Sequence, residues 1–187
     1  MAEKTLFIPV SSRSHFIFSR KAGTIITTSL ISKYKNRKRR KVTLDSNVLI
    51  SYVISKKDNT INKKVVIKSV TDDRLMLSDV IFEECLRHAD GKKARATREE
   101  IASKLLEISP EIIQISPVPP TEDLLMRYKI RDLSDLKILY SVEMTESVIL
   151  VTMDDDFSDV TDLKAKIMRP GDYLFEKNGR ERKKQRK

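Results

Sequence analysis

Residues 42 to 50 read Val42-Thr43-Leu44-Asp45-Ser46-Asn47-Val48-Leu49-Ile50, a short apolar run that ends in an aspartate and resumes after two polar residues. We interpret Val42–Leu44 as a buried strand and predict that Ser46 or Asn47 caps a helix that extends to Ser55. A strand that passes directly into a helix is typical of α/β proteins. The aspartate also has an ordinary explanation, because Asp is favoured at the start of a helix whatever the function.

After this segment, helical and strand-like patterns alternate along the chain. Apolar spacing and capping residues predict helices at 62–70, 78–88, 97–108, 121–128 and 134–145, and short apolar runs predict strands at 75–77, 112–115 and 148–151. Such strands between helices are typical of a parallel sheet that is buried on both faces. The sequence therefore predicts a three-layer α/β/α fold with a mainly parallel central sheet, preceded by a β-rich N-terminal extension.

Charge divides the chain into three parts. Residues 33–41 contain seven bases and no acid, residues 176–187 have a net charge of +5, and residues 42–175 have a net charge of −5 within a total of +10. We predict an N-terminal extension and basic linker at 1–41, a domain at 42–175 and a basic tail at 176–187. Basic arms around an acidic domain suggest a polyanionic partner, although solubilising tails are the alternative interpretation. The predicted nucleic-acid contacts are Arg37, Lys38, Arg39, Arg40, Lys41, Arg182, Lys183, Lys184 and Arg186.

Cysteine content and hydropathy bear on the location of the protein. The lone Cys85 cannot form an internal disulfide, no secretion signal is recognisable, and no apolar run is long enough to cross a bilayer. These features predict a cytoplasmic protein without a membrane segment. Cys85 lies on a predicted helix, where a cysteine is more often a small buried apolar residue than a nucleophile. We interpret Cys85 in this way.

Acidic residues follow the carboxyl ends of the predicted strands. Asp45 follows the first strand, Glu84 lies on the helix after the second, and Asp154 follows the last. Ligands of open parallel sheets bind at these strand ends. Carboxylates that converge there without a cation would raise one another's pKa values, and carboxylate oxygens are the ligands that Mg²⁺ prefers. The pattern therefore favours a site for a divalent metal ion.

Several segments, in this order, resemble the PIN-domain ribonucleases. They are Asp45-Ser46-Asn47 in place of the family's D-T-N, Ser78 followed by Glu84, Asp132-Leu133-Ser134-Asp135, Thr152-Met153-Asp154-Asp155-Asp156-Phe157, and the closing Pro170-Gly171-Asp172-Tyr173-Leu174. The resemblance covers residues 42–174. Cys85 departs from the leucine that the family often has after the glutamate, and the neighbouring Glu83 leaves the register open by one. We take Glu84, because it follows Ser78 by six residues.

The resemblance implies a metal-dependent endoribonuclease that uses Mg²⁺ or Mn²⁺, with the toxin of a toxin–antitoxin pair as one form of this activity. It implies that Asp45, Glu84, Asp135 and Asp154 are catalytic and bind the metal, with Asp156 as a further ligand, and that Asn47, Thr152 and Asp132 support them by hydrogen bonds. RNA, a second copy of the chain and an antitoxin protein are the implied partners. The alternatives are a catalytically silent PIN-like module that binds RNA, an RNA-processing nuclease, and a DNA flap nuclease.

Overall fold

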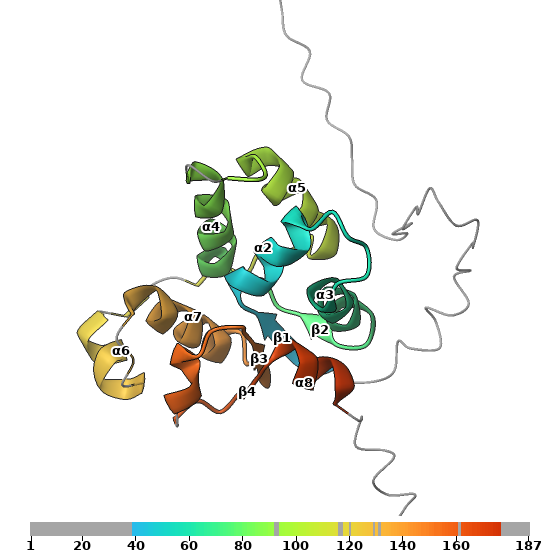
Figure 1. Cartoon of the computed structure of the whole chain (residues 1–187). Helices are drawn as coiled ribbons and strands as arrows, with labels where there is room; N and C mark the ends of the chain where they lie inside the picture. Colours follow the sequence, from blue (N-terminus) through green and yellow to red (C-terminus); the bar gives the residue numbers. More distant parts are fainter. Residues whose placement is uncertain are drawn as a thin grey trace, which may run out of the picture. The chain divides into compact units, whose positions relative to one another are not determined.

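The computed structural model describes residues 39–91, 94–115, 118–119, 121–128, 130, 132–160 and 162–176. The β-rich extension predicted for the N-terminal segment lies outside the described residues, as does most of the basic tail. The described residues belong to one compact domain that starts within the basic linker (Figure 1).

Four short strands form the central sheet of this domain. They are β1 (Lys41–Leu44), β2 (Arg74–Leu75), β3 (Ile149–Val151) and β4 (Lys166–Met168). The strand order is β2-β1-β3-β4, and every neighbouring pair is parallel. The side chains of Val42, Leu44 and Leu150 are fully buried, as unbroken apolar strands require when both faces of a sheet are covered. The predicted parallel sheet is therefore confirmed.

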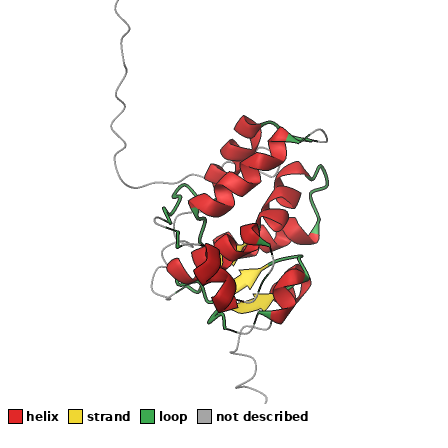
Figure 2. Ribbon diagram, turned by 90° about the vertical axis from the view of Figure 1, so that its left-hand side faces the viewer, coloured by secondary structure: helices red, strands yellow, loops and turns green. Residues whose placement is uncertain are grey.

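Helices cover the sheet on both sides, which confirms the three-layer α/β/α fold (Figure 2). They are α2 (Ser46–Ile54), α3 (Ile61–Thr71), α4 (Asp79–Arg87), α5 (Arg98–Ile108), α6 (Thr121–Tyr128), α7 (Leu133–Met144) and α8 (Pro170–Phe175), with short 3-10 turns η1 (His88–Asp90) and η2 (Asp156–Asp159). Helices α2 to α5 pack as one group, and α6 packs against α7. None of the described helices is long and apolar enough to cross a membrane.

Side-chain caps set where the helices begin. Ser78 caps α4 by accepting a hydrogen bond from the backbone N–H of Ile81, and Thr97 and Glu100 form a reciprocal capping box at the start of α5. The prediction for α2 was wrong in one detail. The helix begins at Ser46 rather than Val48, because Asp45, and not Ser46 or Asn47, occupies the capping position and accepts a hydrogen bond from the Ser46 N–H at 2.6 Å.

The strand predicted at 112–115 is also wrong. This segment forms a single parallel bridge between Ile113 and Ser78 and no strand. The side chain of Asp79 explains why the ladder stops, because its Oδ1 accepts a hydrogen bond from the backbone N–H of Ile115 at 3.1 Å and replaces a strand partner. The second strand is shorter than predicted, and β4 was not predicted because Lys166 gives it a mixed apolar and charged pattern.

The two edges of the sheet carry different polar groups. At the amino edge, Arg40 precedes β1 and Asp73 precedes β2. The Arg40 guanidinium binds both carboxylate oxygens of Asp73, at 3.0 and 3.1 Å, and one oxygen of Glu176 at 2.8 Å. The Tyr173 hydroxyl donates a further hydrogen bond to Asp73 at 2.7 Å. We call Arg40, Asp73, Tyr173 and Glu176 the amino-edge cluster. It joins the last helix, α8, to the starts of β1 and β2.

At the carboxyl edge, the direction in which strands are added to the sheet changes between β1 and β3. The chain moves from β1 outward to β2 and then returns across β1 to form β3 and β4. In open parallel sheets this change of direction leaves a crevice beyond the strand ends, and ligands bind in it. Asp45 follows β1 at this point, and Thr152 follows β3.

Candidate active site

Asp45 is held rigidly at the end of β1. Its backbone N–H bonds to the carbonyl of Val151, which ties it to β3, and its side chain is 2% exposed. One carboxylate oxygen accepts from the Ser46 N–H and the other accepts from the Thr152 hydroxyl, both at 2.6 Å. Burial raises the pKa of Asp45, and these hydrogen bonds partly oppose the rise by stabilising the charged form.

The Thr152 hydroxyl connects Asp45 to the next acidic segment. Besides donating to Asp45, it accepts a hydrogen bond from the backbone N–H of Asp154 at 2.9 Å. Asp154 in turn accepts from the N–H of Asp156 at 3.0 Å, and the Asn47 side chain accepts from the N–H of Met153 at 3.4 Å. The backbone after β3 is thereby folded into a turn that brings Asp154 near Asp45, and Asp156 follows within the same turn.

Three carboxylates converge at this turn. Asp135, Asp154 and Asp156 each offer an oxygen, and these oxygens lie within 4.8 Å of one another. Asp135 reaches the turn from the first turn of α7, whose N-terminus Asp132 caps through a hydrogen bond from the Ser134 N–H at 2.7 Å. The two segments are distant in sequence, so only the fold brings these acids together. Among the described residues this is the tightest group of possible metal ligands.

Asp135 is the acid most perturbed by this arrangement. It is only 8% exposed, and burial together with the charges of the surrounding acids raises its pKa from 3.8 to about 7. The acids that contribute are Asp132, Asp154, Asp45 and Glu84, in this order. We therefore treat these six residues, Asp156 included, as one electrostatic unit and call them the carboxyl-edge cluster.

Glu84 enters the cluster from α4. Burial raises its pKa first, the charge of Asp45 raises it further, and a hydrogen bond from the Ser46 side chain partly opposes both. Glu83, the alternative register, is exposed instead and lies 3.8 Å from Arg98. Cys85 is fully buried, and burial raises its pKa, so that its thiol stays protonated and is not a nucleophile.

The structure thus places the predicted acids around one point, but they differ in how closely their oxygens approach one another. Asp156, predicted only as a further ligand, belongs to the tight group with Asp135 and Asp154, whereas Asp45 and Glu84 lie outside that 4.8 Å group. Each carboxylate oxygen of Asp45 already accepts a hydrogen bond from the protein. Each oxygen has a second lone pair, so it can still bind a metal ion or accept another hydrogen bond. The sequence analysis named Ser46 only as a possible helix cap and not as a site residue, although its side chain contacts both Asp45 and Glu84. Its place directly after the first aspartate was the signal available.

Only some of the basic residues that were predicted to contact nucleic acid lie among the described residues. Arg37, Lys38, Arg182, Lys183, Lys184 and Arg186 lie outside the described residues. Of the others, Arg40 belongs to the amino-edge cluster, and Lys41 starts β1 and pairs with Glu146 at 2.6 Å. Arg39 donates a hydrogen bond to the carbonyl of Val70. Arg40 and Lys41 thus have carboxylate partners within the domain, and their contact with phosphates stays a prediction.

A hollow of about 380 Å³ adjoins the carboxyl-edge cluster. It is lined by Asp154 of the cluster and by Thr152, and on its other side by η2, β4 and the start of α8. Arg169 lies on its border and forms an ion pair with Asp155, the exposed residue between the two aspartates of the turn. The acids therefore stand beside open space rather than inside a sealed core.

Comparison with known proteins agrees with this architecture. The sequence matches the PIN domain family over residues 42–163. The fold resembles that of a chain in the crystal structure of VapBC2 from Rickettsia felis bound to a DNA fragment from their promoter, with a TM-score of 0.50, 15% identity, and coverage of 69% of this chain and 98% of that one. A chain in the structure of FitAB bound to an IR36 DNA fragment aligns with a TM-score of 0.49, 17% identity, and coverage of 69% and 94%.

Among curated proteins, none matches the sequence significantly. The family match alone spans well over half of the chain, and it includes Asp45, Glu84, Asp135 and Asp154. The chain therefore belongs to the PIN domain family, whose members are generally nucleases.

Proposed function

We propose that this protein is a metal-dependent endoribonuclease that hydrolyses RNA phosphodiester bonds at the carboxyl-edge cluster. The observation that carries this proposal is the convergence of Asp135, Asp154 and Asp156, with their oxygens within 4.8 Å of one another, at the strand ends where ligands of parallel sheets bind. Asp45 and Glu84 add negative charge to the same point.

The donor set suits Mg²⁺ or Mn²⁺. Both prefer oxygen ligands, and metal–oxygen distances of about 2.0 to 2.1 Å in an octahedron separate ligand oxygens by about 3 to 4 Å. The 4.8 Å limit of the group is close to this range, so small side-chain rotations suffice. Burial and then repulsion by the other acids raise the pKa of Asp135 to about 7, and a cation would relieve this repulsion.

In this proposal Asp135, Asp154 and Asp156 hold the metal, with Asp45 and Glu84 completing the site directly or through water. When bound, a divalent cation offsets the charge of the phosphate and makes water a better nucleophile. Asp45 is fixed by Ser46 and Thr152, so it is suited to orient the attacking water. Thr152, Asn47 and Asp132 keep the acidic turn and α7 in register.

RNA as the substrate, an antitoxin partner and self-association belong to the proposal as well. The family assignment supports a nuclease, and the fold resembles a chain of the VapBC2 structure, which supports the toxin of a toxin–antitoxin pair acting in the cytoplasm. The basic tail would hold RNA through phosphates, without sequence preference.

The test is cleavage of single-stranded RNA by the full chain, with Mg²⁺ or Mn²⁺, for the wild type and Asp45→Asn. We expect metal-dependent cleavage by the wild type and a loss of at least roughly a hundredfold in the variant, because one charged member of the cluster is removed. Parallel assays on a DNA flap separate the substrate alternatives. RNA binding without cleavage by either protein would instead identify a silent RNA-binding module, and equal cleavage by both would overturn the assignment of the site.

The tail has a separate test. Removal of residues 177–187 should weaken RNA binding and make its dependence on salt concentration less steep, because fewer counterions are released. Fluorescence anisotropy at several salt concentrations measures both effects. If the salt dependence is unchanged, the tail does not contact RNA.

A further inference from the structure

Arg87 is a positively charged side chain at the border of the carboxyl-edge cluster. Arg87 lies on α4 three residues after Glu84, and residues at this spacing share one face of a helix. Glu83 points to a different side, where it meets Arg98. The face of α4 that carries Glu84 into the cluster therefore carries Arg87 as well.

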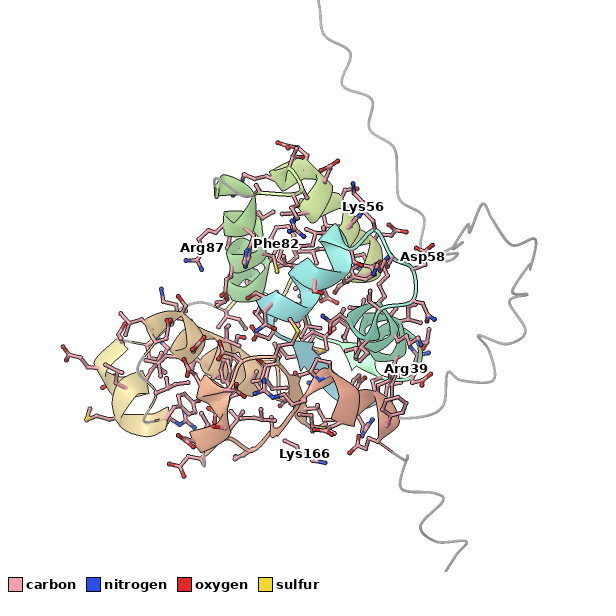
Figure 3. The ribbon with its side chains drawn as sticks, in the orientation of Figure 1. Arg39, Lys56, Asp58, Phe82, Arg87 and Lys166 are labelled. Atoms are coloured by element: carbon pink, nitrogen blue, oxygen red, sulfur yellow. The ribbon has the colours of Figure 1, made fainter. Side chains whose placement is uncertain are left out.

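Arg87 is exposed, and among the described residues it takes part in no ion pair and no side-chain hydrogen bond. Figure 3 shows it projecting outward from α4, on the side of that helix where α6 and α7 lie. Its charge still reaches the cluster, because it partly opposes the rise in the pKa of Glu84. The guanidinium is thus near the acids but remains available to another ligand.

Two other cations near the ends of the strands are not available in this way. Arg169 is paired with Asp155, and Arg40 is bound in the amino-edge cluster. A purely structural role for Arg87 is a favourable interaction with the C-terminal end of α4, since it lies in the last turn. That role needs only a positive charge, and it does not involve RNA.

We propose that Arg87 binds a phosphate of the RNA next to the bond that is cleaved and so positions the strand over the carboxyl-edge cluster. This role rests on the proposed nuclease function. A group of acids repels a polyanion, and a cation at its border offers the strand a point of attachment. Arginine suits this task because its planar guanidinium can donate two parallel hydrogen bonds to one phosphate.

The decisive comparison is Arg87→Gln against Lys137→Gln in the full chain. Lys137 is exposed on α7 two residues after Asp135, so it points to a different face of that helix, and the two variants lose the same charge. We expect Arg87→Gln to raise KM for single-stranded RNA about tenfold with kcat changed less than about twofold, since a uniform binding contact is lost. Lys137→Gln should leave both constants unchanged.

Binding is measured separately, in the Asp45→Asn background, so that it requires no cleavage. Loss of one phosphate contact should reduce the slope of log Kd against log salt by about 0.7 for a single strand. Arg87→Lys should restore the salt slope and only part of the affinity, because lysine makes a single-point contact. Thermal unfolding of each variant shows whether α4 is intact.

The possible results separate the two proposals. If the wild type does not cleave RNA but Arg87→Gln lowers the salt slope, the nuclease function fails and the phosphate contact stands. If the wild type cleaves RNA and Arg87→Gln leaves KM and the salt slope unchanged, the phosphate contact is overturned and the nuclease function stands. A lower melting temperature that Arg87→Lys restores, without any change in KM or salt slope, would assign Arg87 to helix stability alone.

Discussion

Buried carboxylates occur at both the amino and the carboxyl edge of the sheet, but their charged neighbours differ. At the amino edge, Asp73 is 4% exposed and has both oxygens bound by Arg40, with a third hydrogen bond from Tyr173. At the carboxyl edge, Asp45 is 2% and Asp135 8% exposed, but their charged neighbours are other acids. A single fold therefore contains an acid held in an ion pair and a set of acids for which the described residues form no ion pair.

The difference identifies which edge has a structural role. The hydrogen bond with Asp73 is the main cause of the raised pKa of Arg40, and the bond with Arg40 is the main cause of the lowered pKa of Glu176, so the amino-edge cluster stabilises its own charges. At the carboxyl edge, burial and then the charges of neighbouring acids raise the pKa of Asp135 and so disfavour its charged form. Proteins retain an unfavourable arrangement of this kind mainly where function requires it.

Asp73→Asn should have the largest effect on stability. Removing one partner of a buried ion pair leaves the other without compensation, but Arg40 is 35% exposed and keeps Glu176, so we expect a loss of about 2 kcal/mol. For a domain of this size the melting temperature would fall by roughly 4–8 °C. Asp72→Asn, at an exposed neighbour, is the control for thermal unfolding. A loss no greater than that of the control would show that the amino-edge cluster contributes little.

Asp135→Asn should act in the opposite direction. In metal-free buffer at pH 8 we expect it to stabilise the protein by about 1.5 kcal/mol, because it removes a charge from a buried group of acids. Since the folded pKa of about 7 lies above the ordinary value of 3.8, the ionised Asp135 destabilises the wild type increasingly from about pH 4 upward, and fully above about pH 7.

The gain from Asp135→Asn should accordingly shrink as the pH falls toward 4. Denaturant unfolding at several pH values measures this trend, with the exposed Asp162→Asn as the control. Destabilisation by Asp135→Asn at every pH would mean that the acids at the carboxyl edge are already compensated within the protein.

The smallest expected effect is that of Thr152→Val, which tests how the two acidic segments are joined. Loss of the hydroxyl removes the hydrogen bonds to Asp45 and from Asp154, at a cost of about 1 kcal/mol, and should lower RNA cleavage several-fold. Thr43→Val is the matched control, because its buried hydroxyl bonds only to Ser147, at the other end of β3. The control should lose similar stability and no activity; similar loss of activity would assign the effect to folding.

The fold could be predicted from the sequence where the pattern is strong and local. Val42–Leu44 and the run before Val151 are apolar enough to indicate buried strands, and Ser78 and Thr97 mark helix starts directly. The lysine in β4 obscured that strand, and the bond from Asp79 to the Ile115 backbone replaced a ladder that the apolar residues 112–115 had indicated. Contacts between a side chain and a distant backbone leave no local pattern.

The candidate site was predictable in its members and less so in its geometry. Acids that follow strand ends in a parallel sheet approach one another, which indicated Asp45, Glu84 and Asp154. Asp135 was predicted from the resemblance to PIN domains. Which three lie closest depends on the turn that Thr152 organises, and Asp156 joins the tight group because its N–H bonds to Asp154. Arg40 pairs with Asp73, which lies 33 residues away in the sequence. The sequence alone could not distinguish this structural arginine from the other basic residues around it.

A calorimetric titration of the chelator-treated protein with Mn²⁺ tests most directly whether the acids at the carboxyl edge hold a divalent cation. We predict saturable binding to the wild type, affinity at least tenfold weaker in Asp154→Asn, and unchanged affinity in the control Asp162→Asn. Absence of binding to the wild type, or equal affinity in all three proteins, would contradict the account.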